Sequence, residues 1–395
     1  MNTQNDSKSI VFLVESLYRK DQILRILCQK VSWLAENSEY RIYMVLTEKT
    51  KKPNRYELSP KIEMVILDIN YDKLEKKNPI GRVFSYIKKK YQHRRKLKKV
   101  LRKIRPIATV SIMEKEVAFL SHIKAAGQVI YEVHYDERYR VNSSNNRLLA
   151  FLYKFLTWMR ISWLTCRLKK RDILVADTDN MTKIWKKKFK NVQWIPNPLR
   201  EYPPVRDQNE NKKVLAINDN ISETGFEHLI DMWERVANRY PEWRLHLYGI
   251  GNIGQYKELV KSKHLSKSIQ CYNYPDNLNE IYPKYALYIQ ANKIDRFGQY
   301  LMEAMAYSIP CVAYKVPYGP QELIRDEING FLIKPNYLME FSSKLGLLIR
   351  NNELRWEMGR SSYSDVHKYE LNQVMHEWLR LFDSISARKK SKFFF

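Results

Sequence analysis

The sequence predicts an α/β protein made of two doubly wound parallel sheets, with a cleft between the two domains. In both halves of the chain, short apolar runs rich in β-branched residues alternate with longer helical patterns. Continuous apolar runs of this kind are typical of parallel strands that are buried on both faces. A polar stretch at 195–213 carries four prolines and predicts a linker between the halves.

Each apolar run is expected to form one strand, because it is bounded by turn-forming residues and is too short for a helix. In the first half the strands are expected at 9–14, 40–46, 63–69, 108–113, 128–133 and 172–178. In the second half they are expected at 213–217, 244–249, 268–273, 286–291, 310–314 and 330–334.

The domain prediction follows from these strands and from the end of the chain. Residues 1–205 are expected to form an N-terminal Rossmann-like domain, and residues 206–368 a second one. From about Glu353 the pattern is helical, with apolar side chains such as Trp378 and Phe382. A third segment, 369–395, comprises the last helix and a basic-aromatic tail, which can pack back on the N-terminal domain.

The chain is strongly basic, with a formal net charge of +26 and a sequence pI of about 9.7. A field of this sign attracts nucleic acid, anionic lipid or phosphate-bearing substrates. Twelve Lys or Arg residues and no acid lie between Arg82 and Arg105, among apolar residues at helical spacing. They predict one or two amphipathic helices with a cationic face. The residues assigned to this basic face are Lys88, Lys89, Arg94, Arg95, Lys98, Lys99 and Arg102.

An anionic lipid surface is the favoured partner of this face, and a merely solvated helix is the alternative. Nucleic acid is disfavoured, because no recognised binding motif accompanies the charges, and Phe84, Tyr86 and Tyr91 are interpreted as core or interface positions. The best membrane-span candidate, 148–168, contains Lys154 and Arg160. A soluble or peripheral protein is therefore expected.

Two short motifs resemble ligand sites but favour plainer interpretations. Gly249, Gly251 and Gly254 spell G-x-G-x-x-G after a strand, yet no acid follows at the distance that a dinucleotide site needs. We interpret them as a tight strand-to-helix turn at the cleft. Asp177 and Asp179 form D-x-D, which fits a divalent ion less well than the start of a helix. No metal and no other cofactor is expected.

The most informative stretch is DRFGQYLMEAMAYSIPCVAYKVPYGPQELIRDEINGFLI, residues 295–333. Gly298 predicts a turn, and 299–307 a short helix that begins where the preceding strand ends. The free N–H groups and positive dipole end of such a helix can bind a diphosphate. Glu303, one turn into the helix, can accept hydrogen bonds from ribose hydroxyls, and Asp295 is expected to project into the cleft. These features together describe a nucleotide-sugar pocket.

At these residues the sequence resembles the family 4 retaining glycosyltransferases, which have the GT-B fold. That family has two Glu residues in a string like EGFGxxxxEAMAxGxPVVA, and Asp295 and Glu303 stand at their positions. Further segments of the family have counterparts here in the same chain order, namely NVQWIPNPL, VANRYPEWRLHLYGIGN, YGPQELI and INGFLI. VIYEVHYD places His134 where the family has a cleft histidine. The resemblance covers roughly residues 9–385.

The resemblance implies a retaining hexosyltransferase that uses a nucleotide-sugar donor and needs no metal. Asp295 and His134 would then be the catalytic pair, in contact with the donor sugar. Glu303 would bind the ribose, and the amides that follow Gly298 would hold the diphosphate. The donor-binding set is Gly298, Gln299, Tyr300, Glu303, Arg296 and Gly249.

Two departures from the family pattern leave two interpretations open. The Arg and Lys that usually clamp the diphosphate correspond here to Asp219 and Thr224, and the Gly-Gly loop after the first strand is replaced by YRKDQ. Other cations can supply the charge, with Lys293, Arg296, Lys315, Arg19 and Lys20 as candidates. Alternatively, the chain is a catalytically silent homologue that serves as a partner or scaffold subunit. We favour the active enzyme, because the helix with Glu303 is kept.

The resulting prediction is a glycosyltransferase of cell-envelope polysaccharide synthesis, acting on a glycan or lipid-linked acceptor. Capsule, lipopolysaccharide and teichoic acid are the kinds of polymer considered. The predicted location is cytoplasmic, peripheral on the inner face of the plasma membrane, where a cationic acceptor side suits a lipid diphosphate carrier.

Overall fold

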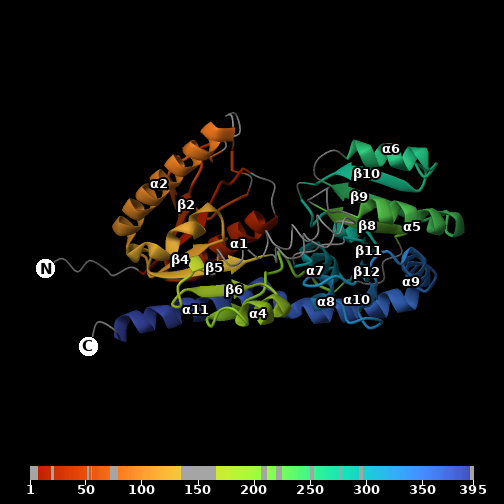
Figure 1. Cartoon of the computed structure of the whole chain (residues 1–395). Helices are drawn as coiled ribbons and strands as arrows, with labels where there is room; N and C mark the ends of the chain where they lie inside the picture. Colours follow the sequence, from red (N-terminus) through yellow and green to blue (C-terminus); the bar gives the residue numbers. More distant parts are fainter. Residues whose placement is uncertain are drawn as a thin grey trace. The chain divides into compact units, whose positions relative to one another are not determined.

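The computed structural model contains two compact units, each built on one parallel sheet (Figure 1). It describes residues 8–18, 22–50, 53–54, 56–71, 79–134, 166–205, 211–218, 225–249, 253–275, 277–292 and 297–391. Unit 1 comprises residues 1–196 and 374–395, and unit 2 comprises residues 197–373. The predicted class, two parallel-sheet α/β domains, is confirmed.

Unit 1 has a seven-stranded sheet in the order β3-β2-β1-β4-β5-β6-β7. Its strands are β1 (Ser9–Val14), β2 (Arg41–Leu46), β3 (Glu63–Ile66), β4 (Ala108–Ser111), β5 (Gln128–Val133), β6 (Ile173–Ala176) and β7 (Val192–Trp194). Six of them lie within the predicted strand segments, and β7 was missed. It has only three residues, two of them exposed, so it lacks the apolar run that marks a buried strand.

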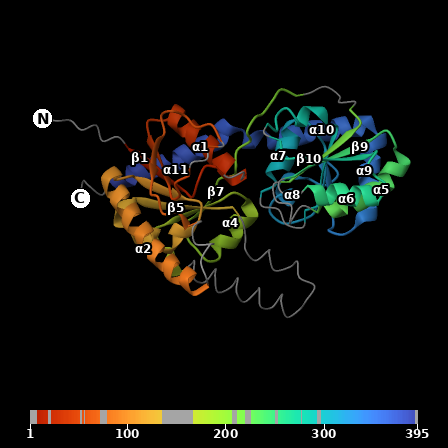
Figure 2. The ribbon, with the colours of Figure 1, turned by 90° about the horizontal axis from the view of Figure 1, so that it is seen from above.

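Helices cover both faces of this sheet. They are α1 (Gln22–Asn37), α2 (Pro79–Ile104), α4 (Asp179–Lys186) and α11 (Leu371–Ser391). Figure 2 shows α1 and α11 on one side of the strands and α2 on the other. The last helix is anchored in unit 1, because Asp383 accepts a hydrogen bond from Tyr40 at 2.5 Å and His376 meets the Trp33 ring edge-on.

Unit 2 has a six-stranded sheet in the order β10-β9-β8-β11-β12-β13. Its strands are β8 (Lys213–Asn218), β9 (Arg244–Gly249), β10 (Ile269–Asn273), β11 (Leu287–Gln290), β12 (Cys311–Tyr314) and β13 (Gly330–Ile333), which agree closely with the predicted segments. Its helices are α5 (Phe226–Arg239), α6 (Gly254–Ser262), α7 (Gln299–Ala306), α8 (Pro320–Leu323), α9 (Leu338–Arg350) and α10 (Asn352–Val366).

Alternating residues of β8 divide the core of unit 2 into two layers. Val214 and Ala216 pack with α5, α6 and α9, whereas Leu215 and Ile217 pack with α7 on the opposite face. The period of two along a strand produces this division. Both layers are apolar and buried, which explains why the strands of this sheet were recognisable as continuous apolar runs.

The boundary between the two units falls within the predicted linker, after Pro196, but the first residues of this stretch are packed. Ile195 and Leu199 are buried, and the Tyr202 ring stacks on Tyr363 with ring centroids 4.3 Å apart. The Leu199 amide donates to the Tyr369 carbonyl at 2.7 Å. Prolines suit such a stretch, because an extended chain that leaves the sheet needs few of its own backbone N–H groups. Residues 206–210 lie outside the described part.

Within the described residues, no helix combines the length and the apolar character that crossing a membrane requires. Most of the candidate span at 148–168 lies outside them, since residues 135–165 are not described.

Candidate active site

The strand order of unit 2 places a binding site between β8 and β11. The chain winds outward from β8 through β9 to β10 and then returns to β11 on the other side of β8. Ligands of doubly wound sheets bind at this reversal, at the carboxyl ends of the strands. Helix α5 follows β8, and α7 follows β11. Two helix N-termini therefore begin beside the same point, where their free N–H groups favour an anion.

Glycines in the left-handed conformation stand at both helix starts. Gly225 precedes α5 with φ 60°, and Gly298 precedes α7 with φ 78°. A Cβ on Gly225 would lie 2.0 Å from the Ala291 carbonyl oxygen, and one on Gly298 would lie 3.0 Å from Leu323 Cδ1. The absence of a side chain thus lets α5 begin directly against the segment that follows β11.

We expect Gly225→Ala to destabilise the protein clearly. The left-handed backbone costs a residue with a Cβ about 1–2 kcal/mol, and the overlap with the Ala291 backbone adds to that cost. Gly346→Ala in α9 is the matched control, because its Cβ would make ordinary 3.5 Å contacts with Tyr240. Alanine in a helix interior gains about 1 kcal/mol over glycine. Urea unfolding of both variants tests the contrast, and equal unfolding free energies would contradict it.

Helix α7 is buried along its whole length, including the Glu303 carboxylate, whose residue is 4 % exposed. The Tyr282 hydroxyl donates to Glu303 Oε2 at 3.0 Å, and Gln299 Nε2 lies 3.4 Å from Oε1. Gln299 Nε2 also donates to the Pro198 carbonyl at 2.9 Å, and the Tyr300 and Tyr274 hydroxyls are 3.0 Å apart. The first turn of α7 is thus held by several hydrogen bonds.

The structure describes only some of the other residues that were predicted to bind the donor. Gly249 is buried at the carboxyl end of β9, the strand beside β8. Residues 250–252 of the predicted turn, Gly251 among them, lie outside the described residues, and α6 begins at Gly254. Asp295 and Arg296 lie outside the described residues, as do Lys293, Asp219, Thr224, Arg19 and Lys20. Lys315 is described and is exposed just after β12.

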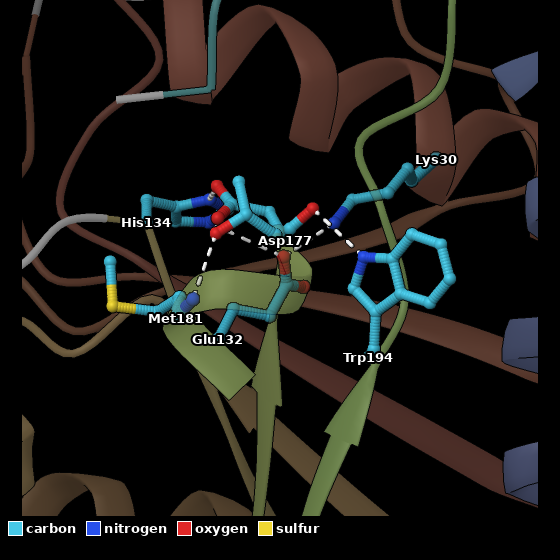
Figure 3. A network of polar contacts seen from close by, with 7 residues as sticks. Lys30, Glu132, His134, Asp177, Met181 and Trp194 are labelled. Carbon is cyan, nitrogen blue, oxygen red and sulfur yellow. Dashed lines mark hydrogen bonds and ion pairs between the residues drawn. The ribbon is translucent and has the colours of Figure 1, made fainter. Parts of the chain in front are cut away.

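In unit 1, His134 stands at the carboxyl edge of the sheet, directly after β5. Its Nδ1 lies 3.2 Å from Asp177 Oδ2, and its Nε2 lies 3.4 Å from Glu132 Oε2. The ring is only 5 % exposed. Figure 3 shows the two carboxylates gathered at the imidazole, with Lys30 reaching Glu132 from α1.

The charges of this cluster balance one another. Burial alone would lower the pKa of His134, but the hydrogen bond with Asp177 and the contact with Glu132 outweigh it and raise the pKa above its ordinary value. Burial alone would raise the pKa of Glu132, but Lys30 and His134 outweigh it and lower the pKa to about 2. The neighbouring carboxylates thus favour the protonated form of His134, and Lys30 and His134 favour the ionised form of Glu132.

The D-x-D motif starts a helix. Thr178 is the N-cap of α4, and its hydroxyl accepts a hydrogen bond from the Met181 amide at 3.1 Å. Asp177 faces His134, and Asp179 pairs with Lys183. Among the described residues, no group of His, Cys, Asp and Glu side chains has an arrangement that would hold a metal ion.

Helix α2 carries the predicted basic face. Six of the seven residues assigned to this face are exposed, namely Lys88, Arg94, Arg95, Lys98, Lys99 and Arg102. Lys89 differs from them, since it is half-buried and donates to the Ile69 carbonyl at 2.5 Å. The expected apolar stripe is buried at Leu97 and Leu101 but not at Ile87.

Three large apolar side chains of the first half of α2, Phe84, Ile87 and Tyr91, are 71 %, 58 % and 68 % exposed. Tyr86 is 40 % exposed. Phe84, Tyr86 and Tyr91 are therefore not core residues, and an interface position is what remains of the prediction. The first half of α2 presents exposed aromatic side chains next to exposed cations.

Lys30 and Glu132 were not predicted as site residues. The sequence does contain a signal for Glu132, because it interrupts the apolar run QVIYEV of β5. A charged residue at a buried strand position needs a partner of opposite charge. The partner, Lys30, is 102 residues away in the sequence, and no local pattern identifies it.

Comparisons with known proteins agree with the resemblance seen in the sequence. Residues 200–365 match the family model described as "Glycosyl transferases group 1". An uncharacterised glycosyltransferase of Haemophilus influenzae is 29 % identical over 246 residues, 61 % of this chain and 67 % of that protein. The poly(ribitol-phosphate) alpha-N-acetylglucosaminyltransferase of Staphylococcus aureus is 24 % identical over 196 residues, 49 % of this chain and 40 % of that protein.

The solved structures extend the likeness to nearly the whole chain. The crystal structure of a mutant of S. aureus TarM, in complex with fondaparinux, alpha-GlcNAc-glycerol and UDP, superposes with a TM-score of 0.75 at 13 % identity. The match covers 95 % of this chain and all of that one. At this identity the likeness concerns the fold.

Proposed function

We propose that the protein is a retaining hexosyltransferase that uses a nucleotide-sugar donor, and the match of residues 200–365 to the glycosyl transferases group 1 family supports this proposal. One observation carries the proposal. Helix α7 begins at Gly298 beside the β8–β11 reversal, with the buried Glu303 carboxylate one turn further on. A helix start for a diphosphate and a carboxylate for a diol are the two features that a sugar nucleotide needs.

The chemistry divides between the two parts of the donor. The amides at the start of α7 would stabilise negative charge as it builds on the departing diphosphate, and Glu303 would hold the ribose. Asp295 and His134 would act at the sugar. We propose that transfer needs no metal ion, and turnover that persists in the presence of a chelator is the expected result.

A UDP-sugar donor and an anionic envelope acceptor are the substrates we favour. The TarM complex is described as containing UDP, and the S. aureus relative is named for transfer to poly(ribitol-phosphate). The net charge of +26 suits an acceptor that carries phosphate, whether a polyol-phosphate chain or a lipid-linked glycan. The proposed process is cell-envelope polysaccharide synthesis.

We also propose that the protein works peripherally on the cytoplasmic face of the plasma membrane. The exposed cations of α2 would bind anionic headgroups, and Phe84, Ile87 and Tyr91 would enter the interfacial layer. Aromatic and apolar side chains are costly to expose to water unless a surface covers them. The combination on one helix favours a membrane over a purely solvated face.

A thermal-shift panel of UDP-, GDP-, ADP- and CMP-sugars tests the donor proposal. A donor present at 100 times its Kd should stabilise the folded protein by about 2.7 kcal/mol, which raises the melting temperature measurably. We expect a response to UDP-sugars, followed by transfer to a polyol-phosphate acceptor.

A flat panel would instead favour the second candidate, a catalytically silent partner subunit. The observation behind that candidate is that Asp219 and Thr224 stand where the family has Arg and Lys.

A further inference from the structure

We propose that Asp177 and Glu132 are positioning residues that hold His134 by its two ring nitrogens and keep it a fixed cation, so that it serves the reaction by its charge and not as a general base. The catalytic part of this inference rests on the proposed function. The pairing itself rests on the geometry of unit 1 alone.

The strand register brings the two residues level. Strands β5 and β6 are parallel neighbours, and Val133 pairs with Ala176. His134 and Asp177 are the next residue of each strand, so they leave the sheet side by side. Their 3.2 Å contact therefore follows from the sheet, and not from a mobile loop. The Trp194 indole N–H donates a hydrogen bond to the Asp177 backbone carbonyl at 3.3 Å, which links the end of β6 to β7.

Glu132 Oε2 lies 3.4 Å from the other ring nitrogen, an ion-pair contact without hydrogen-bond geometry, and Glu132 is itself held by Lys30. Both Glu132 and Lys30 are almost fully buried, and the Lys30 ammonium also lies 4.9 Å from the centre of the Trp378 ring on α11. Among the described residues, the charged groups in contact with the imidazole are one carboxylate from β5 and one from the end of β6, with Lys30 behind the first. If His134 were neutral, the carboxylates of Glu132 and Asp177 would have only the Lys30 ammonium as a nearby cation in this buried site, which is electrostatically costly.

The consequence for the reaction is electrostatic. A neutral histidine can accept a proton, but an imidazolium held at both nitrogens cannot. A cation in a water-poor site acts more strongly than in water on charge that develops nearby.

Nuclear magnetic resonance of the full chain with isotope-labelled histidine tests the pairing without any turnover. In the parent protein the His134 ring should remain protonated above neutral pH. In Asp177→Asn its titration midpoint should fall by about 1–3 pH units, the range expected on losing an opposite charge at this distance. Asp177→Glu should restore part of the shift.

Asp179→Asn is the matched control, since Asp179 is exposed and pairs with Lys183. It should leave the His134 midpoint unchanged. A parent ring that is neutral at pH 7 would overturn the inference, as would an Asp177→Asn midpoint equal to that of the parent.

The pH profile of kcat then tests the catalytic part. If His134 acts by its charge, activity should fall as pH rises through its pKa, which the two carboxylates raise above the ordinary value. Asp177→Asn should move this limb to lower pH with little change in KM. A limb that stays in place would reject the catalytic role. If the donor panel is flat while the nuclear magnetic resonance shift appears, the proposed function fails and the buried cation stands.

Discussion

Replacing Glu303 by glutamine is expected to lower kcat/KM for the nucleotide-sugar donor about 10- to 150-fold while leaving the protein folded. The estimate is the worth of hydrogen bonds to a charged group, about 1.5–3 kcal/mol. Glutamine has nearly the same shape, so the packing of α7 is preserved. Its amide offers one acceptor oxygen, whereas the carboxylate offers two oxygens to the paired hydroxyls of a ribose. Initial rates over a range of donor concentrations measure the effect.

Tyr282→Phe separates donor binding from the support of Glu303. The Tyr282 hydroxyl donates to Glu303 Oε2 and also lies 3.3 Å from the Tyr300 carbonyl oxygen, inside the protein. Its removal leaves the Glu303 carboxyl in place, and the lost hydrogen bond should cost about 0.5–1.5 kcal/mol of stability. We expect kcat/KM to change less than in Glu303→Gln. If both variants match the parent in kcat/KM, Glu303 does not bind the donor.

The strands were predictable because parallel sheets require continuous apolar runs. In β1 and β12 every residue is buried, and both runs stand out in the sequence. The same reasoning fails at β7, where two of three residues are exposed. The boundary between the two units does fall within the predicted linker, after Pro196, but polarity and proline content do not reveal that Leu199 is buried beside Tyr369.

Helix α2 shows the limit of helical periodicity. Leu97 and Leu101 are buried as the pattern requires, but Ile87 and Tyr91 are exposed. At about 3.6 residues per turn, Tyr91 lies on the side of Lys98 and Arg102 and not on the side of Leu97, so the apolar residues do not form one continuous buried stripe. Lys89 was counted with the solvent-facing cations although it binds backbone carbonyls, which only the fold reveals.

The candidate site was predictable where its residues are close in sequence. Gly298 and Glu303 belong to one turn and one short helix, so their relation follows from helix geometry. The cluster around His134 is different, because it joins α1, β5 and the end of β6. Its members are brought together by strand order and register, which a single sequence does not state.

The largest effect on membrane binding is expected from neutralising α2. The triple variant Arg95→Gln, Lys98→Gln and Arg102→Gln should weaken binding to vesicles rich in anionic lipid about 150-fold, since each basic residue near such a surface contributes about 1 kcal/mol. Binding of the parent should also fall steeply with added salt, because the Debye length shortens from about 10 Å at 0.1 M to about 3 Å at 1 M. Vesicle co-sedimentation measures both effects.

The matched control is a triple variant on another exposed basic stretch of the same unit, Lys186→Gln, Lys187→Gln and Lys190→Gln. Both variants lose the same three charges, so a response to net charge alone would weaken vesicle binding equally. Docking through α2 requires the α2 variant to lose far more than the control, and Phe84→Ser should lower affinity further without changing the salt dependence. Equal losses in the two triple variants would show that vesicle binding depends on the positive net charge of the protein and not on α2.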